Sequence, residues 1–282
     1  HVSAIRRFVR FASASKLNML GVGLVLLVLL AAVFGKLLTP YPPNAVELLD
    51  RFKPPSPSHL FGTDDYGRDI FSRVLAGAAI SVQVAAVVIS ISVVLGTLLG
   101  AFAGLVGGLV DEAIMRLTDL FLAFPALILA AAIAATWGGN LTTTVIALAT
   151  VYWPWYARLV RGQVLSLRER EFVTAARVSG AGNTAILRRH LLPNVAPYVI
   201  LQVSLDIGYV ILYTSSLSFL GLGAQPPTAE WGAMMTDARG FMREAWWFPT
   251  FPGLALGLTV LGFNLLGDGL RDWLDPRIGG RR

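Results

Sequence analysis

Three stretches of this chain are too long and too free of charge for an ordinary water-soluble protein. Residues 17–35, 74–110 and 120–157 contain no Asp, Glu, Lys or Arg. A helix needs about 20 apolar residues to cross roughly 30 Å of hydrocarbon, and the two later stretches exceed that length. Charged residues make up 14% of the chain, whereas soluble domains average about 25%. The sequence therefore predicts a polytopic membrane protein of the all-α class.

The apolar stretches divide into six predicted transmembrane helices. The turn residues Trp137-Gly-Gly-Asn140 split the longest uncharged stretch into two. Two more apolar segments follow near the C-terminus, and Asp206 alone interrupts the first of them. Pro125 and Pro154 fall inside predicted helices and should bend them. The expected helices cover residues 17–35, 79–106, 112–136, 141–161, 195–219 and 248–268.

The positions of Lys and Arg predict the orientation in the membrane. Six spans place both termini on the same side as the polar segment 162–194, and 16 of the 23 Lys and Arg residues lie on that side. Cytoplasmic loops carry the excess of basic residues, so we expect both termini in the cytoplasm. The net charge of +6 follows from this distribution, and we expect no nucleic-acid partner.

Glycines recur every fourth residue along the second predicted helix, at Gly96, Gly100, Gly104 and Gly108. They share one helix face, where small residues let two helix backbones approach closely in lipid. Two interpretations remain open: packing against another helix of the same subunit, or an interface with a second subunit.

The outer loop between the first two predicted helices gathers acids and arginines: Asp64, Asp65, Asp69, Arg68 and Arg73. The acids are suited to holding a cation or to pairing with the two arginines, and the basic neighbours favour ion pairs. His59 and His190 lack companion ligands and the chain has no cysteine, so we expect no metal site.

The polar segment Glu169–Asn194 interrupts the apolar C-terminal half. Residues 169–178 predict a short amphipathic helix with Phe172, Ala175, Ala176 and Val178 on its apolar side. The cluster Ser179-Gly-Ala-Gly-Asn183 predicts a reversal, and residues 184–192 a second helix that stops at Pro193. A plain connection between two spans needs only a few residues. We therefore expect a helix–turn–helix that binds a partner in the cytoplasm, with a simple surface loop as the alternative.

Asp206 lies deep in the fifth predicted helix. An acid at that depth is costly unless it is paired or wet, so such residues usually have a function. We expect Asp206 to line a pore and to meet a cationic part of the substrate. The alternative is a hydrogen bond within or between subunits.

Several motifs of self-sufficient proteins are absent from the sequence. There is no Gly-x4-Gly-Lys-Ser/Thr loop to bind ATP and no Gly-x-Ser-x-Gly elbow. We therefore expect a transport subunit with no catalytic residues and no cofactor of its own. A self-sufficient secondary transporter or channel is the alternative, although no inverted repeat is evident.

The polar segment also carries a motif: Thr174-Ala175-Ala176, three residues, Gly180, nine residues, His190, one residue, Leu192-Pro193. It resembles the cytoplasmic signature of permease subunits of ATP-binding-cassette importers, Glu-Ala-Ala-x3-Gly-x9-Ile-x-Leu-Pro. Thr174 replaces the usual Glu and His190 the usual Ile, while Glu171, one turn earlier, offers a substitute acid. Residues 59–75, 218–227 and 264–277 are similar to the C-type permease of dipeptide and oligopeptide importers.

The resemblance implies a type I ABC importer permease fold with a cytoplasmic coupling helix, in the bacterial inner (plasma) membrane. The implied partners are a homologous second permease, two ATPase domains that bind ATP and Mg, an extracytoplasmic substrate-binding protein and membrane lipid. The implied function is import of di- or oligopeptides by alternating access. Relatives of this type carry glutathione or nickel complexes instead. The implied coupling residues are Glu171, Thr174, Ala175, Ala176, Ser179, Gly180, Leu192 and Pro193.

The same resemblance implies an order of segments along the chain. We expect a cytoplasmic basic segment at 1–16, a first transmembrane helix at 17–38 and a periplasmic loop at 39–78. A permease core at 79–272 follows, with its coupling segment at 164–193, and the chain ends in a cytoplasmic tail at 273–282.

Overall fold

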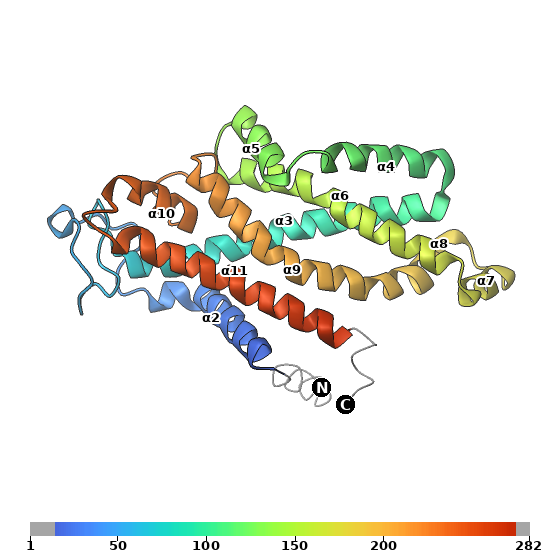
Figure 1. Cartoon of the computed structure of the whole chain (residues 1–282), viewed down its shortest axis with the longest axis horizontal. Coiled ribbons are helices and arrows are strands. Elements are labelled where there is room, and N and C mark those ends of the chain that lie inside the picture. Colours follow the sequence, from blue (N-terminus) through green and yellow to red (C-terminus); the bar gives the residue numbers. More distant parts are fainter. Residues whose placement is uncertain (1–14, 275–282) are drawn as a thin grey trace.

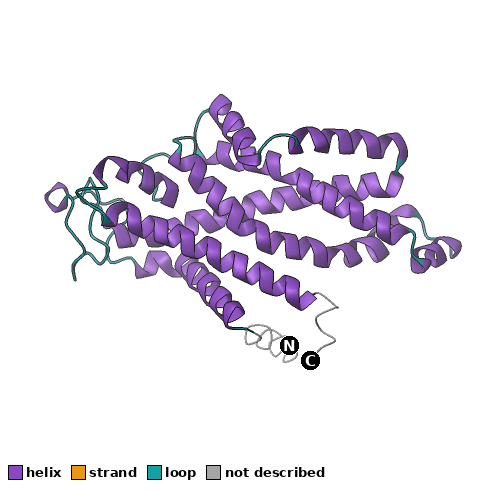
Figure 2. Cartoon of the chain, viewed as in Figure 1, coloured by secondary structure: helices purple, strands orange, loops and turns teal. Residues whose placement is uncertain are grey.

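The computed structural model describes residues 15–274, and these form a bundle of helices without a named strand (Figures 1 and 2). The expected basic segment 1–16 and tail 273–282 lie almost wholly outside the described residues. The long helices are α2 (Lys16–Leu38), α3 (Ile70–Val106), α6 (Leu141–Arg168), α9 (Leu192–Phe219) and α11 (Trp247–Leu274). The shorter α-helices are α4 (Gly108–Leu122), α5 (Ala126–Trp137), α7 (Glu171–Val178), α8 (Asn183–Ile186) and α10 (Trp231–Ala238).

Within residues 15–274, four helices are long and apolar enough to cross a membrane. They are α2, α3, the continuous helical stretch Asn183–Phe219, and α11, and the bent pair α4–α5 counts as a fifth if it forms one span. Helix α6 has 28 residues, or about 42 Å at 1.5 Å per residue. It is long enough to cross a membrane, but its composition is less apolar than that of the four helices above. The all-α membrane fold is confirmed, and the count of six spans stays a prediction.

The third predicted helix, 112–136, is two helices in the structure, and whether the pair forms one span stays a prediction. Helices α4 and α5 meet at an angle of 87° across residues 123–125. Pro125 cannot donate a backbone hydrogen bond, and its ring forces the preceding Phe124 away from helical geometry. Pro154, by contrast, remains inside α6. Pro125 therefore ends one helix and starts another instead of bending one.

Helix α3 begins earlier than the sequence predicts. The Asp69 carboxylate accepts a hydrogen bond from the Ser72 amide at 2.8 Å, and so caps the helix at Ile70. Residues 70–78 were expected in the outer loop 39–78, and they are helical. The sequence does not reveal these first turns, because a charged residue such as Arg73 is expected in water outside the apolar span. In the structure, the Arg73 side chain folds inward and is 1% exposed.

The glycine repeat packs α3 against α6 of the same chain. A Cβ atom on Gly100 would lie 2.2 Å from the Ala157 carbonyl oxygen, and one on Gly96 would lie 2.4 Å from Tyr156 Cβ. Gly104 faces Val164, but Gly108 has nothing within 4 Å. The interpretation as packing within the subunit is confirmed for the first three glycines.

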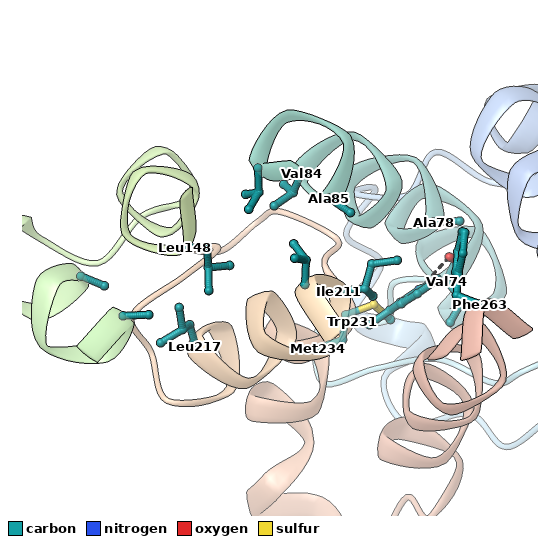
Figure 3. Close-up of a cluster of buried hydrophobic side chains, with 14 of the residues drawn as sticks. Val74, Ala78, Val84, Ala85, Leu148, Ile211, Leu217, Trp231, Met234 and Phe263 are labelled. Atoms are coloured by element: carbon teal, nitrogen blue, oxygen red, sulfur yellow. Dashed lines mark hydrogen bonds between the residues drawn. The ribbon is translucent and has the colours of Figure 1, made fainter. Parts of the chain in front are cut away.

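The outer end of the bundle is closed by α10 and the loop that precedes α3. Trp231 of α10 is 1% exposed, and its indole Nε1 donates to the Val74 carbonyl of α3 at 3.0 Å (Figure 3). Trp247 at the start of α11 donates to the Thr63 carbonyl at 3.1 Å. These two bonds fix the loop, α3, α10 and α11 to one another.

Asp64 and Asp65 of the outer loop pair with its arginines, as predicted, whereas the third acid, Asp69, caps α3 and pairs with His59. Arg68 Nε lies 2.6 Å from Asp64 Oδ2, and the Arg68 guanidinium also lies 3.6 Å from Asp65 and 3.7 Å from Asp237 of α10. Arg73 lies 3.6 Å from the same Asp64 oxygen. The cluster therefore ties the loop to both α3 and α10.

Candidate functional site: a projecting helix and a buried acid

Helix α7 projects from the end of the bundle opposite to α10 and the outer loop (Figure 1). It joins α6 to α8 and consists of eight residues, Glu171–Val178. Arg170 precedes it in extended geometry, and Gly180 follows it with a φ of +84°, which glycine adopts without strain. The chain therefore leaves α6, forms one short helix at the tip and returns.

One side chain of α7 anchors it to the bundle. Val173 is fully buried in a second hydrophobic cluster, which lies apart from the main core and draws on α3, α6 and α9. The buried members of this cluster are Ala101, Tyr156, Val160, Val164, Val173, Ile186, Leu191, Val195 and Val199. The tip is thus packed onto the ends of the long helices.

The apolar side predicted for α7 was wrong. Phe172 is 42% exposed and Val178 is 85% exposed, whereas Val173 is the buried residue. The helix carries apolar residues on both sides, so its sequence did not reveal which side faces the bundle. The tip therefore exposes two apolar side chains, Phe172 and Val178, on different sides of α7.

The second predicted helix of the segment is also different. Helix α8 runs directly into a π-helix at Leu187–Leu191 and then into α9, which starts at Leu192. Pro193 does not stop a helix; it is the second residue of α9, directly after the π-helix, and the helical stretch continues through it. The predicted helix–turn–helix is therefore α7, a turn, and the N-terminal extension of α9.

The structure places six of the eight predicted coupling residues together at the tip. Four of them, Glu171, Thr174, Ala175 and Ser179, line one shallow depression together with Glu169 and Val178. Ala176 is half-buried on the inner side, and Gly180 is exposed in the turn. Leu192 and Pro193 lie on α9, outside this depression.

Asp206 lies in α9 and is 7% exposed. Its Oδ1 accepts a hydrogen bond from Gln202 Nε2, one turn earlier, at 3.0 Å. Its other carboxylate oxygen, Oδ2, has no hydrogen-bond partner among the described residues, nor has the hydroxyl of Tyr156 on α6, which interacts with this carboxylate. A buried oxygen without a hydrogen bond is costly, and the Tyr156 hydroxyl is the polar group of the neighbouring helix that interacts with this carboxylate.

Sequence reasoning missed Gln202 and Tyr156. Gln202 could have been found, because residues four apart on a helix are neighbours. Tyr156 lies on α6, and nothing in the sequence gives the relative register of α6 and α9. Tyr156 also belongs to the hydrophobic cluster that holds Val173, so continuous packing connects the tip with the surroundings of Asp206.

Comparison with known protein families identifies the family of this chain. Residues 96–280 match the family described as "Binding-protein-dependent transport system inner membrane component", and residues 3–55 match "N-terminal TM domain of oligopeptide transport permease C". The chain belongs to this family of permease subunits of ABC importers.

Curated relatives are similar over most of their length. The chain is 44% identical over 276 residues to the probable D,D-dipeptide transport system permease protein DdpC of Escherichia coli K12, covering 98% of this chain and 93% of the relative. It is 49% identical to the glutathione transport system permease protein GsiD of Salmonella paratyphi A, covering 92% and 86%. It is 44% identical to the nickel transport system permease protein NikC of Escherichia coli K12, covering 90% and 92%.

A solved structure supports the same fold. A chain of the MetNI methionine ABC transporter in an inward-facing conformation matches with a TM-score of 0.58 at 18% identity. The match covers 72% of this chain and 96% of that chain. The type I ABC importer permease fold is therefore confirmed.

Proposed function

We propose that this chain forms half of the pore of an ATP-driven importer in the bacterial inner membrane and that it carries di- or oligopeptides into the cytoplasm. A second, homologous permease completes the pore. Two ATPase domains bind ATP and Mg, and an extracytoplasmic binding protein delivers the peptide. Family membership supports this assembly over a self-sufficient channel or secondary transporter. The positive-inside distribution supports placing both termini and α7 in the cytoplasm.

The observation that carries the proposal is the tip formed by α7. It is anchored by a buried Val173 and yet exposes Phe172 and Val178. An ATPase subunit that grips this helix and moves it would move α6 and α9 with it, because they share one packed cluster. In this way closure of the ATPases on ATP switches the access of the pore.

Glu171 is the acidic residue of α7 that we expect to contribute an ion pair to the contact with the ATPase. It stands in the first turn of α7 and borders the same depression as Thr174, the position where the family motif usually carries the acid. We infer that Glu171 supplies the carboxylate for a basic residue of the ATPase.

Cysteine crosslinking in the assembled transporter tests the coupling role. The chain has no cysteine, so each variant carries a single thiol. Ala175→Cys and Ser179→Cys lie on the exposed side of α7 and should crosslink to a cysteine in the docking groove of the ATPase. Ser58→Cys, exposed on the outer loop, is the matched control and should not. Absence of a crosslink at both α7 positions, in a transporter shown to be assembled, would defeat the proposal.

A separate experiment identifies the substrate. Relatives with dipeptide, nickel and glutathione in their names are similar to this chain at 44%, 44% and 49% identity, so identity alone does not separate them. Binding of dipeptides, oligopeptides, glutathione and nickel chelates to the cognate external protein should be measured by calorimetry. Peptide binding supports the proposal, and selective binding of glutathione or a nickel complex would replace it.

A further inference from the structure

Helix α9 carries polar side chains along one face for most of its length. They are spaced by three or four positions, which places them on the same side of a helix. The members of this polar stripe are Tyr198, Gln202, Asp206, Tyr209, Tyr213 and Ser216. From its first to its last member the helix rises about 27 Å at 1.5 Å per residue. The polar stripe therefore crosses most of the roughly 30 Å of hydrocarbon and is not confined to one membrane surface.

The polar stripe lies on the open side of α9. The helix lies between α6 and α11 and also contacts α3 (Figure 1). Tyr198 and Tyr209 are 49% and 46% exposed, and Tyr209 is the only exposed residue between positions 201 and 219 of the described chain. Asp206 forms the buried edge of the stripe, where Tyr156 of α6 interacts with it. The half-buried members are Gln202, Tyr213 and Ser216.

The exposed faces of the neighbouring long helices are apolar instead. From residue 91 to residue 106, every exposed residue of α3 is apolar, namely Ile91, Val94, Leu95, Leu98, Phe102 and Val106. Helix α11 exposes Leu254, Leu258 and Leu261. These faces suit hydrocarbon, whereas an amide and an acid turned toward lipid would be costly. The polar stripe of α9 is therefore unlike the lipid-compatible faces of the same bundle.

The polar stripe is also unlike a close helix–helix contact. Helices in a membrane approach each other through small residues, and α9 keeps its small residues on its other sides. A Cβ on Gly208 would lie 3.3 Å from Asn264 Oδ1 of α11, and Ser204 and Ser215 are buried. The open side presents the large ring of Tyr209 instead. A continuous polar face of this kind suits water and a passing solute.

The polar stripe offers charge of one sign only. Asp206 is its acid, and no Lys or Arg occurs between residues 195 and 219. Tyr209 lies one turn from Asp206, and the face of a tyrosine ring attracts cations. The Tyr213 ring meets the ring of Tyr152 on α6 with their centroids 6.1 Å apart, which extends the aromatic surface to α6. An ammonium group therefore finds a carboxylate and ring faces here, and a carboxylate group finds no cation.

We propose that the polar stripe is this subunit's wall of a water-filled translocation pathway, and that Tyr209 beside Asp206 makes this wall favour cationic groups over anionic ones. The inference rests on the proposed function, because it takes the chain to form half of a pore. It favours substrates with a free ammonium group, such as a peptide N-terminus, over substrates whose charges are mainly carboxylates.

Cysteine modification in the complete transporter tests the wall. The assembled complex is placed in nanodiscs, which leave both membrane faces accessible, and is treated with a trimethylammonium methanethiosulfonate. Mass spectrometry of this chain, which has no other cysteine, measures the reaction. The thiolate is the reactive form, and it forms in water and not in lipid. We expect Tyr209→Cys and Ser216→Cys to react.

Val94→Cys is the matched control for depth and exposure. Val94 is 56% exposed on the apolar face of α3. It lies near the depth of Asp206, because Gly96 of the same helix contacts Tyr156. Val94→Cys should stay unmodified. An equal reaction at Val94→Cys would overturn the proposed wall, as would no reaction at either cysteine of the polar stripe.

The charge preference is tested with a sulfonate methanethiosulfonate, which is anionic. The ratio of the cationic to the anionic reaction rate at Tyr209→Cys should exceed the ratio at Ser58→Cys, which is exposed on the outer loop. Adding Asp206→Asn to Tyr209→Cys should lower the ratio. Equal ratios at the two cysteines would overturn the preference for cations.

Each variant is first checked for assembly by size-exclusion chromatography. Ser216→Cys exchanges one oxygen for sulfur, and it replaces Tyr209→Cys in both measurements if the latter does not assemble. The α7 crosslinks test the proposed function separately. Unreactive stripe cysteines in a transporter that does crosslink through α7 would therefore overturn this inference alone.

Discussion

Asp206 is held by one partner where a buried carboxylate normally has several. Gln202 satisfies Oδ1, and Oδ2 is left without a hydrogen bond among the described residues. A structural acid fixed only for packing would normally be fully paired, because a lone buried charge is costly. Tyr156 on α6 also interacts with this carboxylate, and we propose that the two side chains meet a cationic part of the substrate in the pore.

We predict that Asp206→Ala and Asp206→Asn lower transport while leaving assembly and basal ATPase activity largely intact. Losing a charge that pairs with substrate costs about 2–5 kcal/mol, which corresponds to a loss of at least about thirtyfold. Uptake of labelled substrate into proteoliposomes is the measurement. Tyr156→Phe, which removes the hydroxyl that interacts with this carboxylate, should have a smaller effect. Loss of assembly in Asp206→Asn would assign the residue to folding instead.

Gly100 is the tightest point between α3 and α6, because the obstacle is backbone and cannot rotate away. We predict that Gly100→Ala lowers the thermal midpoint of the detergent-solubilised protein, since overpacking costs about 1–3 kcal/mol. Gly162→Ala on α6 is the matched control, because nothing lies within 4 Å of its Cβ position. That control should leave the midpoint unchanged or raise it slightly, because alanine favours helix over glycine. Equal behaviour of the two variants would contradict the packing argument.

Two acids link the outer loop to α10 through Arg68 and respond to pH. Burial raises the pKa of Asp65, with the neighbouring Asp64 charge adding to the effect, and burial also raises the pKa of Asp237. A carboxyl whose folded pKa lies above its unfolded value of about 3.9 stabilises the fold at low pH. That contribution is lost as the pH rises through the folded pKa.

We therefore predict that the loop is held more firmly as the pH falls from 7 toward 4.5. Hydrogen exchange of residues 59–69, corrected for the intrinsic rate at each pH, measures this. The double variant Asp65→Asn, Asp237→Asn should show a weaker pH dependence. Asp50, whose pKa is lowered mainly by its bond to Lys53, works in the opposite direction in both proteins and cancels in the comparison. An identical profile for the two proteins would contradict the assignment.

The long helices could be predicted from the sequence because lack of charge over 20 or more residues has one main physical solution in lipid. The positions where these helices break could not be predicted. Pro125 ends a helix while Pro154 stays inside one, and only the packing around each decides between these outcomes. Pro193 at the start of α9 and a proline that stops a helix look the same in sequence.

The coupling segment was located by its motif, but its orientation was not predictable. An eight-residue helix with apolar residues on both sides has no unique inner face. Val173 was overlooked in favour of Phe172 for this reason. The neighbours of Asp206 on α6 were out of reach, because the register between two helices depends on side chains along their whole contact.

The orientation of the whole molecule follows from the charge distribution and is directly testable. We predict that Ser58→Cys reacts with a membrane-impermeant maleimide in intact cells stripped of the outer membrane. Ser179→Cys should react only after the inner membrane is opened. Both side chains are exposed and the chain has no competing cysteine. Reaction of Ser179→Cys in sealed cells would reverse the assigned topology, and with it the cytoplasmic position of α7.

The interlocked contact of α3 and α6 restricts how the bundle can change shape. Three glycines of α3 lie so close to the backbone and side chains of α6 that a Cβ atom at any of them would clash. Ser92 Oγ also donates a hydrogen bond to the Ala149 carbonyl at 3.4 Å. Sliding one helix past the other would drive these surfaces into each other. We therefore expect the two helices to keep their contact and to move together when the bundle changes shape. The junction before Pro125 and the π-helix at Leu187–Leu191 are the irregular segments where bending is then expected.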